Sequence, residues 1–581
     1  MAKKSAPPDK QVQKGPGILS LLKPYRRMIF VLIFFALLSN GINLAIPRII
    51  AGGIDAYPSH YVLQDVLIKF LSAAIIIFIF TWLQTVVQTN TSERVARDLR
   101  SKLANKISRQ SYAFIEAANP SKLLTNLTAD VDSIKLFVSQ AIVSIASSLI
   151  IIIGACIMLC SINWKLALTT ISIIPIIGGA FYLVQKKVRV IFIKSRQVID
   201  RLNKVINESI LGAALIRVIN SQQPEYEKFI AANTEAKNLG LSILRLFAWL
   251  IPVIVLTASL AGITILALGG HFVIINTMSL GNFAAFNSYL SLLIFPIIII
   301  GFMSNVIIQA TASYQRINGL LDLPEIPDSG TIKDSLKGNI SLSNVSVIYG
   351  GKPALRNISF SVSSGSTLAI IGPTAAGKTQ LLYLMTGLIK ANEGTVEFDG
   401  KSIDSYNKEN FYSHVGFVFQ DSIIFNMSIR ENIAFSDKVT DESLAMAIDT
   451  AELRDFINSL PGKLDTIVSE RGTSLSGGQK QRIMLARALA INPTILLLDD
   501  FTARIDTHTE LKILNNIRQN YPGISLISIT QKIASIEHFD QIIVLMESEI
   551  VATGMHKELM TSSPEYVQIY DSQQSTSNYE L

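Results

Sequence analysis

Six apolar runs separated by polar segments fill the first half of the chain. They lie at residues 28–50, 67–88, 138–160, 166–183, 246–268 and 283–308. Each run is close to the roughly 20 residues that an α-helix needs to cross the hydrocarbon core of a bilayer. The pattern predicts an all-α transmembrane domain with six helices, preceded by a short amphipathic stretch at residues 18–25.

The charges between the runs predict the orientation in the membrane. No Lys or Arg occurs at residues 49–68 or 248–313, whereas the segment between the second and third runs carries eight. Because cytoplasmic segments retain Lys and Arg, both termini are expected in the cytoplasm. We expect a multi-pass protein of the cell membrane, and a bacterial plasma membrane is favoured because no targeting extension precedes the first run.

The polar segments 89–137 and 184–245 are long, yet they keep helical periodicity. If each forms two helical arms of about 25 to 30 residues, the arms extend roughly 38 to 45 Å from the membrane. The turns between the arms are expected near residues 115–120 and 220–225.

The composition of the chain fits a protein that lies partly in a membrane, and its two halves differ in charge. Hydrophobic residues make up 49% and charged residues 16%. Up to residue 325 there are 30 Lys and Arg against 15 Asp and Glu, and beyond it 21 against 29. The basic residues lie between apolar runs, so the positive-inside rule explains them and no nucleic-acid partner is expected. Cys156 and Cys160 lie inside the third run and are interpreted as small apolar residues.

From residue 338 the pattern changes to short strands and helices. The apolar strand 367–371 leads into a loop that fits G-x-x-x-x-G-K-[ST], and the helical run 380–388 follows. In this context backbone N–H groups can cradle phosphates and a lysine can neutralise them. The expected ATP-binding residues of this loop are Gly372, Pro373, Thr374, Ala375, Ala376, Gly377, Lys378, Thr379 and Gln380.

A second stretch with candidate binding residues occupies residues 473–506. Its turn can present N–H groups, a hydroxyl and an amide to an anion, and the helix that follows adds the positive end of its dipole. A continuous apolar strand, residues 495–498, then delivers Asp499 and Asp500 to the edge at which ligands bind in open α/β sheets.

Together these motifs resemble the nucleotide-binding domain of the ATP-binding cassette (ABC) family, and residues 114–132 look like the first intracellular loop of ABC exporters. The family signature L-S-G-G-Q corresponds to Leu475, Ser476, Gly477, Gly478 and Gln479. The resemblance implies an α/β P-loop domain after the membrane domain. It also implies that residues 18–25 form an elbow helix and that the turns between the arms are coupling helices.

The resemblance further implies ATP and Mg²⁺ as cofactors. Tyr349 would stack on adenine, and Mg²⁺ would be held by Thr379, Gln420 and, through water, Asp499. Asp506 would close the loop after the acids. The implied domains are a transmembrane domain at 1–325, a linker at 326–337, the nucleotide-binding domain at 338–570 and a C-terminal tail at 571–581.

Three positions depart from the family pattern. Ala375 replaces a glycine of the phosphate loop. Asp500 replaces the Glu that serves as general base, and a misplacement near 1 Å can cost about a hundredfold in rate. Gln531 replaces the switch His and cannot take up a proton. The chain's own site is therefore expected to hold ATP with little turnover, while its intact signature completes the site of a partner.

The function expected from these residues is ATP-driven export of small amphipathic or hydrophobic molecules, drug-like or lipid-like, by one half of a heterodimer of ABC half-transporters. No Asp, Glu or His lies well inside an apolar run, which fits a cargo with few charges. Three alternatives remain open: a homodimer with two slow sites, an importer on the same fold, as in some siderophore importers, and a regulatory or channel-like protein gated by ATP.

Overall fold

The computed structural model describes residues 17–60, 63–325, 330–349, 351–469, 472, 474–502 and 504–577, with the side chains of residues 58–60, 116–117, 349 and 575–577 left out. The chain divides into two compact units. The first comprises residues 1–109 and 118–324, and the second comprises 110–117 and 325–581.

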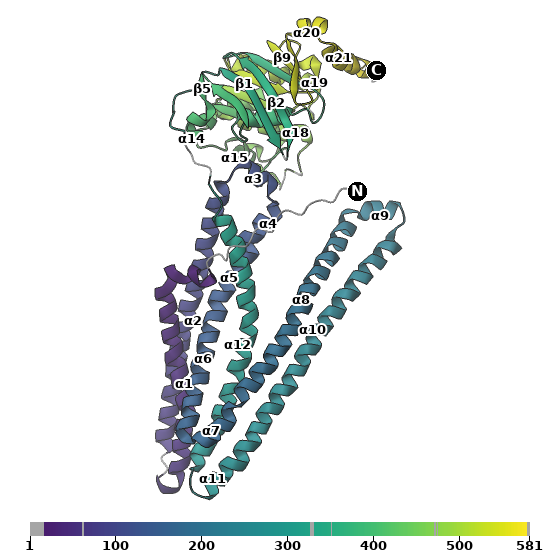
Figure 1. Cartoon of the computed structure of the whole chain (residues 1–581). Coiled ribbons are helices and arrows are strands. Elements are labelled where there is room, and N and C mark those ends of the chain that lie inside the picture. The colour runs from purple at the N-terminus through teal and green to yellow at the C-terminus, as the bar shows by residue number, and fades with distance from the viewer. Residues whose placement is uncertain are drawn as a thin grey trace. The chain divides into compact units, whose positions relative to one another are not determined.

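The first unit consists of helices (Figure 1). In chain order they are η1 (Ile18–Tyr25), α1 (Arg26–His60), α2 (Leu63–Ser108), α4 (Pro120–Thr125), η2 (Asn126–Asp130), α5 (Val131–Leu136), η3 (Phe137–Ala141), α6 (Ile142–Ile162), α7 (Trp164–Ile171), α8 (Ile173–Leu211), α9 (Ala213–Val218), α10 (Gln222–Thr264), η4 (Ile265–Gly269), α11 (Gly270–Ile274) and α12 (Leu280–Leu321).

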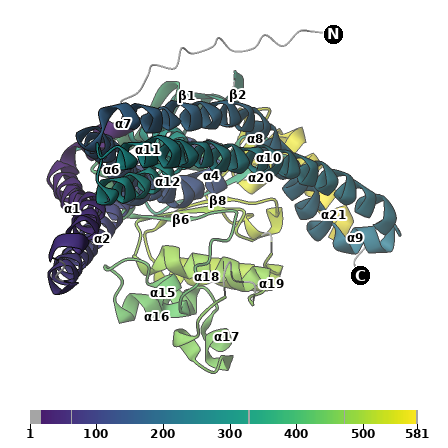
Figure 2. The ribbon, with the colours of Figure 1, turned by 90° about the horizontal axis from the view of Figure 1, so that it is seen from below.

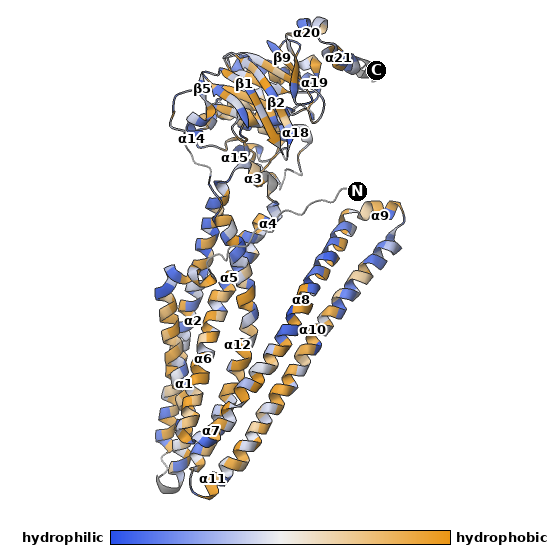
Figure 3. Cartoon of the chain, viewed as in Figure 1, coloured by the Kyte–Doolittle hydropathy of each residue, from blue (hydrophilic) through white to orange (hydrophobic). Residues whose placement is uncertain are grey.

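Six continuous helical stretches among the described residues are long and apolar enough to cross a membrane. They are Ile18–Tyr57, Leu63–Ser108, Pro120–Ile162, Trp164–Leu211, Gln222–Ile274 and Leu280–Leu321. The predicted six-helix domain is therefore confirmed. Figure 3 shows α8 and α10 mostly apolar near α7 and α11 and more polar toward α9, as expected of helices that leave the bilayer.

The helical arms are continuous with the membrane spans, and α8 and α10 lie side by side along their length (Figures 1 and 2). The turn between these two arms lies at residues 219–221, where Asn220 adopts φ +53°. Asn tolerates this left-handed conformation better than most residues. The coupling role of this tip, and of the short helix α3 (Tyr112–Ala117) that groups with the second unit, stays a prediction.

The second unit contains two sheets. The four-stranded antiparallel sheet has the order β2-β1-β4-β5, and the six-stranded sheet has the order β10-β9-β3-β8-β7-β6. The strands are β1 (Ile340–Tyr349), β2 (Lys352–Val362), β3 (Thr367–Ile371), β4 (Glu393–Phe398), β5 (Lys401–Ser402), β6 (Val415–Val418), β7 (Ile495–Asp499), β8 (Ser525–Ile529), β9 (Gln541–Met546) and β10 (Glu549–Gly554). Strands β3, β6, β7, β8 and β9 pair in parallel.

Besides α3, the second unit contains helices between and after its strands. They are α13 (Lys378–Met385), η5 (Ile403–Ser405), α14 (Lys408–Tyr412), α15 (Ile429–Ile433), α16 (Asp441–Thr450), α17 (Arg454–Ser459), η6 (Lys463–Asp465), α18 (Gly477–Ala490), α19 (Thr507–Asn520), η8 (Ile533–Ser535), α20 (His556–Ser562) and α21 (Pro564–Ser577). In Figure 2, α18 and α19 lie along one side of β6 and β8, and α15, α16 and α17 lie beyond α18. The predicted α/β domain is thus confirmed.

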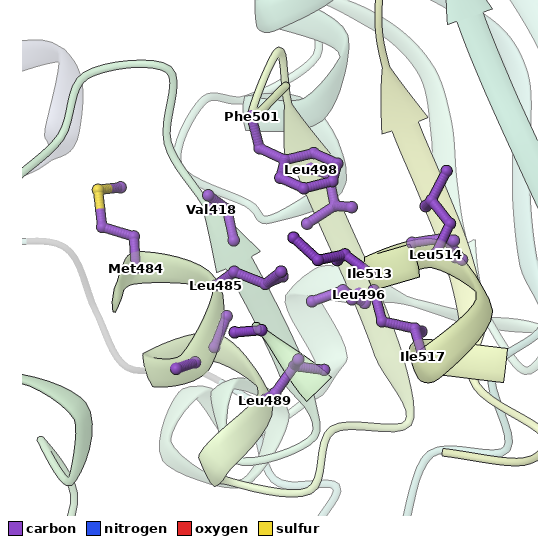
Figure 4. Close-up of a cluster of buried hydrophobic side chains, with 14 of the residues drawn as sticks. Val418, Met484, Leu485, Leu489, Leu496, Leu498, Phe501, Ile513, Leu514 and Ile517 are labelled. Carbon is purple, nitrogen blue, oxygen red and sulfur yellow. The ribbon is translucent and has the colours of Figure 1, made fainter. Parts of the chain in front are cut away.

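The core of this unit explains why strands β3, β7 and β8 are continuous apolar runs. Every residue of β3 and of β7 is buried, because both faces of the sheet are covered. Figure 4 shows Leu496 and Leu498 of β7 between Leu485 and Leu489 of α18 and Ile513 of α19. This packing holds the ends of the central strands in fixed register.

Candidate functional site

The carboxyl ends of three neighbouring parallel strands meet at one edge of the six-stranded sheet. Strand β3 runs into the phosphate-binding loop, β7 ends in Asp499, and β8 runs into Gln531. Ile370 and Asp499 both pair with Ile529, the last residue of β8. The sheet register therefore brings together three segments that are far apart in the sequence.

The phosphate-binding loop has glycines where its backbone requires them. Gly372 adopts φ +150°, and a Cβ there would lie 1.9 Å from the Leu545 carbonyl oxygen. Gly377 adopts φ +100°, and its Cβ would lie 2.4 Å from the Ala354 carbonyl oxygen. A side chain at either position would collide with backbone, so the loop can take this path only with glycine.

Ala375 lies in the same loop at φ +67°, in the left-handed region that a residue with a Cβ disfavours. A glycine, which the family has at this position, would adopt this conformation without the steric cost of a Cβ.

Lys378 folds back onto the loop. Its Nζ donates hydrogen bonds of 2.8 Å to the carbonyl oxygens of Gly372 and Pro373. Burial lowers the pKa of this lysine, and the nearby carboxyls Asp500 and Asp499 partly offset the shift. A positive charge held at the mouth of a loop of N–H groups suits binding of polyphosphate.

Thr379 and Asp499 form the acidic side of the cleft. The Thr379 hydroxyl donates to Asp499 Oδ1 at 3.2 Å. Asp499 Oδ2 and Gln380 Oε1 are buried, and within the described part of the chain no group donates to either. Burial raises the pKa of the Asp499 carboxyl to about 6, while the bond from Thr379 opposes the shift. A bound cation would therefore favour the ionised form of this carboxyl.

Magnesium fits this set of donors. The side chains of Thr379, Gln420 and Asp499 line one cleft of about 290 Å³. Carboxylate, hydroxyl and amide oxygens are the hard donors that Mg²⁺ accepts beside phosphate oxygens. A bound Mg²⁺ would supply positive charge to Asp499 and to the phosphates.

Asp500 and Gln531 line the same cleft as the phosphate loop. The Asp500 backbone N–H donates to the Ile529 carbonyl at 3.0 Å, and its φ is +46°. Burial raises the pKa of the Asp500 carboxyl, and the positive charges of Lys378 and Lys532 oppose this. All three residues that depart from the family pattern, Ala375, Asp500 and Gln531, thus line one cleft.

The signature residues line a different cleft. Ser476 caps α18, with its Oγ accepting from the Gln479 N–H at 3.3 Å while the Gln479 side chain accepts from the Ser476 N–H at 2.8 Å. Ser476, Gly477 and Gly478 line a second cleft with Arg504 and Asp506. The residues that line the two clefts do not overlap within the described part of the chain.

Comparison with known proteins identifies the family. The model of the ABC transporter transmembrane region matches residues 29–297, and the ABC transporter model matches residues 355–503. The uncharacterized ABC transporter ATP-binding protein YfiB of Bacillus subtilis is 31% identical over 562 residues, which cover 96% of this chain and 98% of that protein. This chain belongs to the ABC transporter family.

Two further relatives have descriptive names. The probable multidrug resistance ABC transporter ATP-binding/permease protein YheI of Bacillus subtilis is 30% identical over 570 residues, covering 95% of this chain and 96% of that protein. An ATP-dependent lipid A-core flippase of Syntrophus aciditrophicus is 28% identical over 516 residues, covering 87% and 86%. Both are similar to this ABC transporter over both of its units.

Among solved structures, a bacterial Atm1-family ABC exporter with ATP bound matches with a TM-score of 0.80 at 24% identity, covering 95% of this chain and 99% of that one. The fold is therefore that of an ABC exporter. This ABC transporter is a multi-pass plasma-membrane protein with a cytoplasmic ATP-binding domain, and ATP binding and hydrolysis are coupled to transport.

The remaining predicted site residues lie as follows. The Tyr349 side chain is outside the described residues, so its role as adenine contact stays a prediction. Leu475 packs against the core rather than lining the second cleft. Gln420 is exposed, and its carbonyl oxygen accepts from Gln481 Nε2 of α18 at 3.1 Å. The roles assigned to individual residues stay predictions.

Sequence reasoning missed the residues that support this site. Lys532, directly after the switch position, donates to the carbonyl oxygens of Thr502 at 3.2 Å and Ile505 at 2.8 Å, and it pairs with Glu510 at 3.2 Å. The segment 530–533 after β8 contains the switch position and is called the switch segment below. Gln573 of α21 contacts its backbone at Gln531 and Ile533. Proximity to the switch could have flagged Lys532, but no sequence signal links residue 573 to residue 531.

Proposed function

We propose that this ABC transporter is one half of a heterodimer that exports small amphipathic molecules, and that its own ATP site turns over slowly while its signature completes the partner's site. The observation that carries the proposal is the pair of separate clefts. One holds an intact phosphate loop beside Asp500 and Gln531, and the other holds an intact signature beside Arg504.

In this proposal, the loop at 372–380 binds the triphosphate, and Thr379, Gln420 and Asp499 hold Mg²⁺. Without Mg²⁺, Asp499 Oδ2 is buried with no hydrogen-bond donor among the described residues, and Lys378 bonds to loop carbonyl oxygens rather than to this carboxylate. Tyr349 stacks on the adenine. The domain limits at residues 325, 337 and 570 are part of the same proposal.

Slow turnover follows from the two substituted residues. A shorter carboxylate at Asp500 stands farther from an attacking water than Glu would, and the amide of Gln531 can bond to a phosphate oxygen without accepting its proton. Gln420 is exposed and lines the cleft, which supports a role for it in sensing the γ-phosphate.

A partner chain is supported by exposed apolar residues in the first unit. At the tip formed by α9 and its neighbours, Leu211, Leu215 and Val218 are 79%, 62% and 84% exposed. Apolar side chains gathered at the polar end of two arms mark a surface that a second protein covers. An amphipathic cargo agrees with relatives named for multidrug resistance and lipid A-core flipping.

The test compares single substitutions in the purified two-chain complex. Gly477→Asp should abolish most ATPase activity although the partner is unchanged, because a carboxylate would face the partner's γ-phosphate. A Cβ at this position would lie 2.8 Å from Cδ of the flexible Arg504 side chain, which can move to make room. Asp500→Asn should cost far less, because it removes an already poor base.

The reverse pattern, or robust turnover by this chain purified alone, would favour the homodimer. A rescue experiment completes the test. Asp500→Glu with Gln531→His should raise hydrolysis at this chain's own site, measured with the partner's base removed. If the double variant stays as slow as the parent, another feature such as Ala375 limits the site.

A further inference from the structure

We propose that Gln573 in the C-terminal helix α21 is a positioning residue for the switch segment, and that it sets where Gln531 enters the nucleotide cleft. This inference rests on the proposed function for the role of Gln531 toward the γ-phosphate. The contact between α21 and the switch segment is independent of that role.

The Gln573 amide bonds to two backbone groups on either side of Lys532. Its Oε1 accepts from the Ile533 N–H at 3.0 Å, and its Nε2 donates to the Gln531 carbonyl oxygen. A primary amide can donate and accept at once, whereas a carboxylate, an amine or an alkyl group cannot satisfy both. One side chain therefore fixes the peptide geometry at the switch position.

Helix α21 is anchored firmly enough to act as a reference. Tyr566 is fully buried, and its hydroxyl bonds to His556 Nδ1 at 2.7 Å. Ile569 and Tyr570 pack against the main core of the unit. Residues 566, 569, 570 and 573 follow helical spacing, so Gln573 lies on the packed face of α21.

The switch segment is tied on its other side by Lys532 and Thr530. The Thr530 hydroxyl accepts from the Lys532 N–H at 3.0 Å, and Lys532 Nζ reaches the carbonyl oxygens of Thr502 and Ile505. Ile533 is buried in the core. The backbone of Gln531 is thus fixed between the loop after β7 and the C-terminal helix, while its side chain lines the cleft.

The experiment uses the full-length chain in lipid nanodiscs and three variants. Gln573→Leu removes both bonds. Gln573→Glu keeps an acceptor for the Ile533 N–H but places a carboxylate against the Gln531 carbonyl. Gln574→Leu is the matched control, because the Gln574 amide contacts the Tyr570 hydroxyl at 3.3 Å on the same helix.

Hydrogen–deuterium exchange of the peptide spanning residues 531–536 tests the positioning directly. Exchange should rise in Gln573→Leu and not in Gln574→Leu. Binding of a non-hydrolysable ATP analogue should weaken about fivefold in Gln573→Leu with ADP binding unchanged, the scale of a lost hydrogen bond. In a Gln531→Ala background, Gln573→Leu should cause no further loss.

The outcomes separate the two proposals. Unchanged exchange in Gln573→Leu, or an equal further loss in the Gln531→Ala background, overturns the positioning role. If Gln531→Ala itself leaves the preference for the triphosphate unchanged, the proposed γ-phosphate contact fails. Raised exchange in Gln573→Leu would then still support the positioning role.

Discussion

At the scale of single residues, the nucleotide cleft keeps Gly372, Gly377 and Lys378 of the phosphate loop and carries substitutions at Ala375, Asp500 and Gln531. Gly372 and Gly377 are required by the backbone, because a Cβ at either would overlap a carbonyl oxygen. Ala375 and Asp500 both adopt a positive φ, of +67° and +46°, which the Cβ of each residue makes unfavourable. In the predicted roles, the cleft keeps the groups that bind phosphate and changes two, Asp500 and Gln531, that would move a proton.

Ala375→Gly should stabilise the phosphate loop. Removing the Cβ from a left-handed residue should stabilise the folded state by about 1 kcal/mol. We therefore expect a modest rise in thermal midpoint together with tighter ATP binding. The measurement is nucleotide affinity and thermal unfolding of the full-length chain. Ala376→Gly is the control, because Ala376 is buried and outside the left-handed region, so its loss should destabilise the loop. Equal effects at both positions would contradict the conformational explanation.

Asp499 predicts a dependence of stability on pH. Its folded-state pKa of about 6 is above the ordinary value of 3.8, so its contribution to stability is present below about pH 4 and is lost as pH rises through 6. Asp499→Asn should therefore raise the nucleotide-free thermal midpoint at pH 7.5 by about 2 to 4 °C, and should have little effect at pH 4.

The same Asp499→Asn variant should lose the Mg²⁺-dependent part of ATP binding. Asp506→Asn is the contrast, because hydrogen bonds from Thr509 lower the pKa of Asp506, and its substitution should not raise stability at pH 7.5. A midpoint that is unchanged in Asp499→Asn at both pH values would show that the carboxylate is already compensated.

At the scale of elements, the switch segment depends on neighbours on both sides. Lys532 connects it to the loop after β7 and to α19, and Gln573 connects it to α21. In the first unit, the buried Asp130 of η2 accepts from Ser313 Oγ at 2.8 Å and from Arg316 Nε at 3.0 Å, both on α12. Each unit thus contains a buried carboxylate, Asp130 in the first and Glu510 in the second, that is paired with a cation remote in the sequence.

The pair Lys532–Glu510 should be strongly coupled. The Glu510 side chain is 1% exposed, so Lys532→Met leaves a buried carboxylate unpaired, at a cost of about 3 to 5 kcal/mol. Lys532→Met should lower the thermal midpoint less at pH 5 than at pH 8. The reason is that burial already raises the pKa of Glu510 and protonation removes the unpaired charge.

Glu510→Gln in the same chain should recover most of the stability lost in Lys532→Met. Lys401→Met is the control, because its bridge to Asp334 at 2.7 Å is exposed and should contribute almost nothing. A loss in Lys532→Met that does not depend on pH would mean that packing, rather than the charge of Glu510, is responsible.

At the scale of the whole molecule, the six spans and the two separate clefts support the proposed half-transporter. The six spans found in the described residues are even in number, which agrees with the prediction that both termini are cytoplasmic. The phosphate loop and the signature line different clefts of the same unit. In the proposed heterodimer, each cleft would be completed by the other chain. Function would then belong to the pair rather than to this chain.

Cysteine labelling tests the topology. In a chain with Cys156 and Cys160 replaced by Ala, Thr277→Cys in the short loop before α12 should react with a membrane-impermeant maleimide on intact cells. Gln223→Cys, at the start of α10, should react only after permeabilisation. Both positions are exposed, so access rather than burial decides the result. Labelling of Gln223→Cys on intact cells would reverse the orientation.

Local pattern alone determined the spans, the apolar strands and the phosphate loop. Apolar runs near 20 residues can satisfy their backbone only as helices in lipid, and G-x-x-x-x-G-K-T between an apolar strand and a helix has a strong local constraint. Gly372 and Gly377 illustrate this, because the backbone path of the loop that contains them requires glycine at both positions.

Only the tertiary structure decided how distant segments meet. The register of β3, β7 and β8 places Lys378, Asp499 and Gln531 in one cleft, and burial there raises the pKa of Asp499. The two bonds from Gln573 to the switch backbone join residues 40 and 42 positions apart. Such contacts depend on packing between elements, and a sequence pattern carries no distance between residues that are remote along the chain.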